Sequence, residues 1–230
     1  MSEVRLWVLP LDVARDLRVD HVLGGAERDR AARFRQPDDA ARYVAGRVLL
    51  RLAAADLLGL RAQDVRLARR CPVCHSTEHG RPVVVGAAGR AHLSLTHGGG
   101  VIAVAAGTAP VGIDVEPHVR PRDLDALAQQ VLTAAERAAI GAAADRFHEL
   151  WTLKEAFIKA CGLTLDALGE IDVLAALAAP AWIEHGPVRL LCRRLELAPA
   201  HAAALASSDA RVVTSDAVGA VGSLAACSPP

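Results

Sequence analysis

Aromatic side chains are scarce in this chain of 230 residues, at 3%, although 52% of the residues are hydrophobic. The core must therefore be built mainly from Leu, Val, Ile and Ala rather than from large rings. A chain of this length can bury one large core or two small ones, so an architecture of two roughly equal halves fits it.

Net charge and long apolar runs are also lacking. The 26 basic residues balance the 26 acidic ones, which argues against a general binder of nucleic acid or of anionic membranes. The sequence after Met1 has no apolar segment typical of a signal peptide. The most apolar later stretch, Val101 to Ala106, is far shorter than the roughly 18 residues that cross a bilayer. We therefore expect a cytoplasmic protein with no nucleic-acid or membrane partner.

Cysteine occurs only five times, and only Cys71 and Cys74 lie close together. An odd number of scattered cysteines is typical of reduced thiols in a cytosolic protein. The Cys-x-x-Cys pair is followed by His75 and His79, and all four residues are of types that bind zinc. Four ligands from one short segment, two of them adjacent, are sterically awkward, and no second Cys-x-x-Cys follows. A zinc site and a loop with reduced thiols both stay open at this point.

Lysine is the scarcest charged residue, because Lys154 and Lys159 are the only two and all other Lys/Arg positions hold arginine. Both lie in a helix predicted from about Asp145 to Cys161, which Gly162 would end. Glu155 and Lys159 are four residues apart, so a carboxylate and an ammonium project from one face. Taken alone, an exposed ion pair is the commoner explanation. A compact ammonium retained in an arginine-rich chain would fit a specific chemical role.

Helical patterns dominate the first and the middle part of the chain. Helices are predicted from Ala26 to Arg35 and from Pro37 to about Gly59. A third helical stretch, from Leu124 to Ala144, is interrupted where Thr133 and Glu136 predict a new helix start. By composition alone, the arginines of the first two helices form a solvated face with acidic partners. They are Arg28, Arg30, Arg33, Arg35, Arg42, Arg47 and Arg51.

Short apolar runs predict strands around these helices. Val4 to Leu9 alternates and ends at a proline, and His92 to Ala105 is typical of two strands joined by a glycine-rich turn. The glycines allow backbone N–H groups to approach an anion closely, although such turns are also ordinary in hairpins. Further strands are predicted at residues 83–85, 188–192 and 195–197, and residues 200–206 are ambiguous between strand and helix.

Two carboxylates occur in a predicted strand from Val111 to Pro117. Asp114 and Glu116 share one face of this strand, about 7 Å apart, and apolar residues occupy the other face. Such a pair beside a core is unfavourable unless a cation lies between the two groups. Magnesium would suit, because it prefers carboxylate and phosphate oxygens. An exposed strand end stopped by the proline is the equally simple alternative.

The strand Gly-Ile-Asp-Val-Glu and, about forty residues later, the helix motif Trp-x-x-Lys-Glu-Ala-x-x-Lys occur in this order. Together they resemble the 4′-phosphopantetheinyl transferases, specifically the monomeric, pseudo-duplicated type that activates peptide and polyketide synthases. The resemblance covers most of the chain, from about Gly25 to Ala206. It includes Arg30 to Arg51, Gly80-Arg81-Pro82 and Ser94-Leu95-Thr96-His97.

The resemblance implies an α/β (α+β) fold with two similar subdomains. Each would be a small sheet packed on a long helix, with the active site in the cleft between them. Residues 1–109 would form the N-terminal subdomain, which grips the nucleotide of coenzyme A. Residues 110–230 would form the C-terminal subdomain, which carries the magnesium and the catalytic groups.

The same resemblance implies a reaction and a role for each matching residue. The 4′-phosphopantetheine arm of coenzyme A would move to a serine of an acyl or peptidyl carrier protein, releasing adenosine 3′,5′-bisphosphate. Lys154 and Lys159 would neutralise the pyrophosphate, and Glu155 would be the base, directly or through a metal-bound water. Asp114, Glu116 and Glu155 would hold magnesium, and Arg28, Arg30, Arg42, Arg81, Thr96 and His97 would bind coenzyme A.

Some positions depart from the family pattern. Arginine replaces lysine in the N-terminal phosphate-binding run and at Arg81, which keeps the charge but alters its geometry. Ser94 and Thr96 stand where Asn and Ser are frequent. The arginine- and alanine-rich composition favours a role in secondary metabolism.

Three other functions fit parts of the pattern. One is another magnesium-dependent enzyme acting on a nucleotide pyrophosphate. The second is a non-catalytic homologue that holds coenzyme A or a carrier protein, and the third is a zinc-knuckle adaptor. The intact set of carboxylates and lysines argues against a decayed site.

Overall fold

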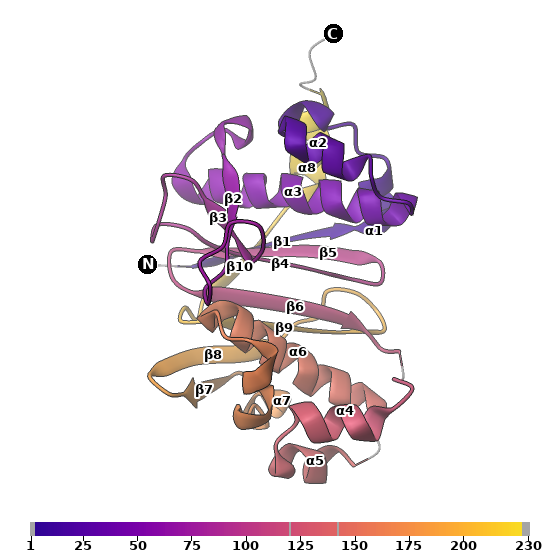
Figure 1. Ribbon diagram of the computed structural model, residues 1–230, viewed down its shortest axis with the longest axis vertical. Helices are drawn as coiled ribbons and strands as arrows, with labels where there is room; N and C mark the ends of the chain where they lie inside the picture. Colours follow the sequence, from indigo (N-terminus) through magenta and orange to yellow (C-terminus); the bar gives the residue numbers. More distant parts are fainter. Residues whose placement is uncertain (1–2, 120, 142, 227–230) are drawn as a thin grey trace.

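The computed structural model describes residues 3–119, 121–141 and 143–226. Its two halves each pack one long helix on a four-stranded sheet (Figure 1). The long helices are α3 (Pro37–Leu58) and α6 (Ala144–Cys161). The expected α/β class with two helix-on-sheet subdomains is confirmed.

The strands form two main sheets and one small hairpin. The first sheet contains β1 (Val4–Pro10), β4 (His92–Gly98), β5 (Val101–Gly107) and β10 (Val212–Ser215), in the order β10-β1-β5-β4. The second contains β6 (Val111–Pro117), β7 (Ala181–His185), β8 (Val188–Arg194) and β9 (His201–Ser207), in the order β6-β9-β8-β7. The hairpin pairs β2 (Leu67–Arg70) with β3 (Arg81–Val84).

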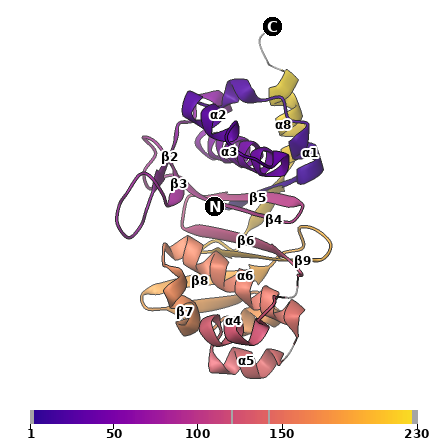
Figure 2. The same ribbon diagram turned by 45° about the vertical axis from the view of Figure 1, so that its right-hand side comes forward.

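The helices lie on the outer sides and the two sheets lie between them (Figures 1 and 2). Each long helix covers its own apolar core against one sheet. A third buried apolar group joins the two sheets, so the halves cannot separate without exposing core surface to water. Its members are Val4, Leu6, Val101, Ala103, Ala105, Val111, Ile113 and Leu205.

Local sequence signals set the ends of the long helices. Pro37 is the first residue of α3, and Gly59 ends that helix in the left-handed conformation, with φ 67°. Gly162 ends α6 in the same way, with φ 74°. Thr133 and Glu136 form the predicted capping box at the start of a shorter helix, α5 (Ala134–Ile140). These signals act within one turn, which is why the sequence alone predicts them.

The end of the chain returns to the N-terminal half. β10 pairs in parallel with β1, and α8 (Ala217–Ala226) contributes Ala217 and Val221 to the N-terminal core (Figure 1). The expectation that residues 110–230 form the C-terminal subdomain is therefore wrong for this last segment. Its parallel partner lies some two hundred residues earlier, so no local pattern announces the pairing.

Other predicted elements shift in detail. Of residues 200–206, which were ambiguous, all but Ala200 lie in β9, whereas residues 195–197 are not a strand. Leu195 and Leu197 instead pack beside the third core, which explains their alternation. The remaining helices are α1 (Leu11–Arg15), α2 (Gly25–Ala31), α4 (Leu124–Val131) and α7 (Ala175–Ala178), with 3-10 turns at Asp20–Val22, Ala62–Asp64 and Leu165–Glu170.

Two expectations about the whole chain bear on its environment. Within the described ranges, no helix is both long and apolar enough to cross a membrane. The four described cysteines are free thiols: Cys71, Cys74, Cys161 and Cys192. Cys227 lies outside the described residues.

Candidate active site

Two hydroxyl groups connect the halves where β4 meets β6. Ser94 Oγ accepts a hydrogen bond from the backbone N–H of Ile113 at 3.1 Å, and Thr96 Oγ1 accepts one from the N–H of Val115 at 3.2 Å. Thr96 Oγ1 also donates to Asp114 Oδ1 at 3.0 Å. The side chains of β4 thus fix the backbone of β6 and one carboxylate on it.

Gly112 brings α6 close to β6. A Cβ atom at this position would overlap the carbonyl oxygen of Ala156 and the backbone nitrogen of Ala160. Only glycine allows such an approach of helix to strand. Because Ala156 directly follows Glu155, the contact sets the functional face of α6 beside the carboxylates of β6.

Asp114 lies at the centre of this arrangement and is 3% exposed. Lys159 Nζ donates to Asp114 Oδ1 at 2.5 Å and lies 3.8 Å from Glu155 Oε2. The other oxygen, Asp114 Oδ2, is buried and has no hydrogen-bond partner among the described residues. A buried carboxylate oxygen without a partner is unfavourable, so this atom is suited to accept a ligand or a cation.

Glu116 and Glu155 complete a group of three carboxylates. Burial raises the pKa of Glu155, and the charges of Asp114 and Glu116 raise it further against the opposing effect of Lys159. Burial and then the charge of Asp114 raise the pKa of Glu116. The three groups therefore lie close enough to repel one another, and one ammonium only partly offsets three negative charges.

Positive side chains gather at the end of β4 next to these carboxylates. Arg42 donates to the carbonyl oxygen of Gly99 at 3.1 Å, which holds its guanidinium over the glycine-rich turn. Burial lowers the pKa of His97, and the positive charges of Arg42 and, to a smaller extent, Lys159 lower it further. A neutral His97 can donate its ring N–H to an anion as a hydrogen bond, and its other ring nitrogen can accept a proton.

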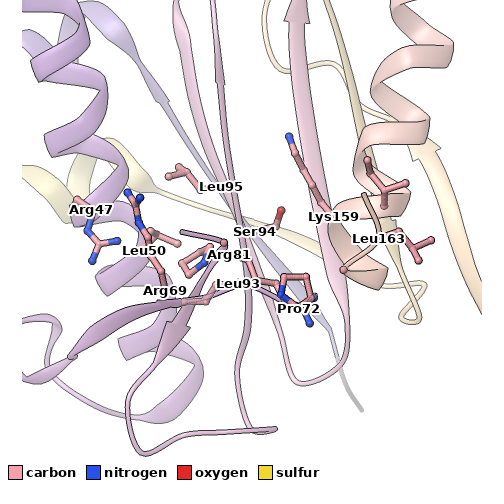
Figure 3. Close-up of a pocket in the computed structure, with 14 residues that line it drawn as sticks. Arg47, Leu50, Arg69, Pro72, Arg81, Leu93, Ser94, Leu95, Lys159 and Leu163 are labelled. Carbon is pink, nitrogen blue, oxygen red and sulfur yellow. The ribbon is translucent and has the colours of Figure 1, made fainter. Parts of the chain in front are cut away.

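A cavity of about 440 Å³ lies beside the carboxylates and Lys159, and Lys159 forms part of its wall. Its volume is in the range of small-molecule sites. Figure 3 shows α3 contributing Arg47 and Leu50, and α6 contributing Lys159, with Leu163 just beyond the end of α6. The other lining residues are Arg69, Pro72, Gly80, Arg81, Pro82, Leu93, Ser94, Leu95, Ile158 and Gly162.

Three guanidinium groups line this cavity. Arg81 lies in it as the resemblance implies, and it donates to the carbonyl oxygen of Ala160 at 3.3 Å. Arg47 and Arg69 were not singled out from the sequence. The expectation of a solvated face is wrong for Arg47, which is buried and pairs with Glu27 at 2.5 Å, as Arg51 does at 2.7 Å. The spacing of four residues between these two arginines on one helix was the available sequence signal.

The structure does not bring Lys154 to this site, which corrects the expectation that it neutralises a pyrophosphate. Its side chain is fully buried, and Nζ lies 2.7 Å from Glu136 Oε2. It also donates to the carbonyl oxygens of Leu168 at 2.7 Å and Ile171 at 2.6 Å. All three ammonium protons are thus used inside the C-terminal core. Consecutive helix residues point about 100° apart, and here Lys154 points into the C-terminal core while Glu155 lies beside Lys159.

The remaining expected coenzyme A ligands are placed differently. The cavity lining, within the part of the chain that the structure describes, does not include Arg28 or Arg30. Arg28 donates to the carbonyl oxygen of Leu23 at 2.5 Å, and Arg30 lies 5.6 Å from the ring centroid of Tyr43. Thr96 is buried and positions Asp114, so its hydroxyl acts between strands.

These features define an α/β enzyme of two helix-on-sheet halves whose junction holds carboxylates and cations beside a ligand-sized cavity. The sequence matches two family models in succession. The model described as "4′-phosphopantetheinyl transferase, N-terminal" covers residues 16–109, and that of the "4′-phosphopantetheinyl transferase superfamily" covers residues 110–206. The chain belongs to the 4′-phosphopantetheinyl transferase superfamily, a class of transferases.

Curated relatives carry the same description. The 4′-phosphopantetheinyl transferase HetI of Nostoc sp. is 30% identical over 209 residues, covering 86% of this chain and 84% of that protein. A 4′-phosphopantetheinyl transferase of Bacillus subtilis is 29% identical over 158 residues, covering 66% of each chain. The transferase Sfp of Bacillus subtilis strain 168 is 28% identical over 155 residues, covering 65% of each.

Proposed function

We propose that this protein transfers the 4′-phosphopantetheine arm of coenzyme A to a serine of an acyl or peptidyl carrier protein and releases adenosine 3′,5′-bisphosphate. The observation that carries the proposal is the convergence of Asp114, Glu116 and Glu155 with Lys159 at the wall of an arginine-lined cavity. Phosphoryl transfer depends on charge neutralisation and positioning more than on a covalent intermediate, and this set of groups suits both.

The carboxylates fit a magnesium ion. This cation prefers oxygen ligands. Asp114 Oδ2 is buried and has no partner among the described residues. Burial and neighbouring negative charge raise the pKa values of Glu116 and Glu155, so a cation at this place would compensate the charge of the three carboxylates. Asp114, Glu116 and Glu155 would hold the ion. When bound, it would neutralise phosphate oxygens and so lower the barrier to attack on phosphorus.

The cations of the chain bind and orient the phosphates. Lys159 is closest to the carboxylates and holds the pyrophosphate at the reacting phosphorus. Arg81, with Arg47 and Arg69, offers guanidinium groups to the remaining phosphates within the cavity. Arg42 and His97, at the end of β4, would bind the 3′-phosphate end of the nucleotide.

Glu155 takes the proton from the carrier serine. Its pKa is raised by burial, and a carboxylate with a raised pKa is a stronger base that can accept a hydroxyl proton. The same side chain is a proposed magnesium ligand, so its removal should affect both binding of the cation and proton transfer.

The carriers would belong to polyketide or nonribosomal-peptide synthesis in the cytoplasm, and the protein would act as a monomer. The arginine-rich N-terminal half supports docking of a carrier, because carrier domains are commonly acidic near the serine and opposite charge steers association. The composition, rich in arginine and alanine, agrees with a role in secondary metabolism.

Release of adenosine 3′,5′-bisphosphate tests this proposal against hydrolysis of the same pyrophosphate. The protein, coenzyme A and magnesium are incubated with and without an apo carrier, and the nucleotide is separated by chromatography. We expect release that requires the carrier, because the serine is the attacking group. Equal release without a carrier would instead indicate a hydrolase, and a carrier with its serine changed to alanine is the matched control.

A further inference from the structure

The tip of the β2–β3 hairpin gathers metal-binding side chains that have no role in the proposed transfer. Residues 71–80 form this tip, which projects from the side of the N-terminal half (Figure 2). Gly80 closes it with φ 103°, where a Cβ atom would overlap the backbone of Arg70 and Cys71. The two ends of the loop are therefore in direct contact.

Three side chains of this tip converge on one point. The ligand atoms of Cys71, Cys74 and His79 all lie within 4.8 Å of one another. Cys74 Sγ is 3.3 Å from His79 Nε2. Tetrahedral coordination with zinc–sulfur and zinc–nitrogen bonds of about 2.3 and 2.05 Å would place a sulfur and a nitrogen about 3.5 Å apart. Cys74 and His79 are thus already close to the separation that such an ion requires, and the Cys71 sulfur lies within 4.8 Å of both.

The backbone of the Cys-x-x-Cys segment supports the first sulfur. The N–H groups of Val73 and Cys74 donate to the Cys71 thiol, and the N–H of His75 donates to the Cys71 carbonyl oxygen at 3.1 Å. His75 has φ 59°, a left-handed turn immediately after the second cysteine. The hydrogen bond from His75 to Cys71 closes a turn that contains both cysteines, whose sulfurs lie within 4.8 Å of each other.

Four ligands from this segment would be sterically awkward, because Cys74 and His75 are adjacent. The structure does not require both of them to bind the same ion. Within the described part of the chain, the convergent group contains His79 but not His75. Three ligands separated by at least two residues are geometrically compatible with one small ion. Soft thiolate and imidazole ligands select zinc over magnesium or calcium.

We propose that Cys71, Cys74 and His79 bind one zinc ion, with a water molecule as the fourth ligand. Both thiols lose their protons to the solvent on binding, and two thiolates balance the charge of the ion. No oxidation or reduction is involved. The site is separate from the carboxylates proposed to hold magnesium, and its existence does not depend on the proposed transfer.

The ion would fix one wall of the cavity. Pro72, between the two cysteines, contacts the end of α6, since a Cβ atom at Gly162 would meet its side chain at 2.9 Å. Pro72, Gly80 and Arg81 all line the cavity. A two-stranded hairpin has little stability of its own, so a metal clip at its tip would hold these residues against the C-terminal half.

Metal analysis of the purified full-length protein tests the site without any activity measurement. We expect one zinc per chain after purification in reductant and dialysis against metal-free buffer. Cobalt(II) replacement should give sulfur-to-metal charge-transfer absorption and intense visible bands typical of tetrahedral coordination. Cys74→Ser and His79→Ala should each weaken zinc affinity by more than about 100-fold, beyond the loss typical of residues that only orient ligands.

Two matched variants keep the assignment specific. His75→Asn changes the neighbouring histidine but preserves a residue that tolerates positive φ. Cys161→Ala removes a thiol outside the group, whose pKa burial raises to about 11. Both should retain one zinc per chain. Wild-type protein without zinc, a Cys71–Cys74 disulfide in freshly purified protein, or equal loss of zinc in the control variants would each overturn the proposal.

Discussion

Replacing Glu155 with alanine should lower the rate of transfer to a carrier by about 10²–10⁴-fold, the usual loss when a general base is removed. Glu155 is the one carboxylate of the site that lies on α6, beside Lys159 and opposite the strand carboxylates. Its removal takes away both a proposed magnesium ligand and the proposed proton acceptor. Initial rates at saturating coenzyme A and carrier, with purified variants, measure the effect.

The fold should tolerate this change. Burial and neighbouring negative charges raise the pKa of Glu155, so its ionised form destabilises the folded state at neutral pH. Glu155→Ala and Glu155→Gln should therefore melt at the same temperature as the wild type or higher. Glu149→Ala is the matched control on the same helix, because Glu149 pairs with Arg194 at 2.6 Å and should leave transfer nearly unchanged. Near-normal turnover by Glu155→Ala would contradict the assigned role.

Lys159→Ala belongs to the same comparison. It removes the ammonium that contacts Asp114 and lines the cavity, and it should reduce transfer by about 10²–10³-fold, as expected for loss of one group that stabilises developing charge. Lys159→Arg keeps the charge without the compact geometry and should recover only part of the rate.

Lys154→Met should destabilise the protein by about 3–5 kcal/mol, the typical cost of leaving one partner of a buried ion pair uncompensated. Glu136 would remain at 0% side-chain exposure without its cation. It would still bind the backbone N–H of Thr133 at 2.8 Å and that of Val173 at 2.9 Å, so it could not turn to water without breaking both bonds. Denaturant unfolding followed by circular dichroism measures the loss.

A second variant distinguishes a broken ion pair from a simple change of volume. Lys154→Met combined with Glu136→Gln removes both charges and leaves an amide whose single oxygen can accept from one of the two backbone N–H groups that Glu136 binds. This double variant should regain part of the stability lost by Lys154→Met alone. A loss below about 1 kcal/mol for Lys154→Met would contradict the interior role, because it would equal an exposed ion pair.

The two lysines show what sequence can and cannot predict here. Their rarity correctly drew attention to α6, and the four-residue spacing of Glu155 and Lys159 correctly placed both on one face. Lys154 belongs to the same motif but points into the C-terminal core, toward Glu136 on another helix. The partner of a buried charge is fixed by tertiary packing, which no spacing within one helix reveals.

Local signals predicted elements well, and long-range pairings less so. Proline, glycine and the Thr133–Glu136 capping pattern gave the ends of helices, because each acts within one turn. The pairing of β10 with β1 joins the two ends of the chain, and two short strands carry no signal for it. Arg69 in the cavity wall was missed for the same reason, since its hairpin reaches α6 only in three dimensions.

Mass spectrometry of an apo carrier protein tests the central claim most directly. The carrier is incubated with coenzyme A, magnesium and this protein, then with EDTA in place of free magnesium, and finally with excess magnesium added back to the chelated sample. The proposed transfer predicts a gain of about 340 Da on the carrier serine, its loss with EDTA and its return with magnesium alone, without added zinc. No gain with several classes of carrier, despite tight binding of coenzyme A, would contradict transfer and favour a non-catalytic binding protein.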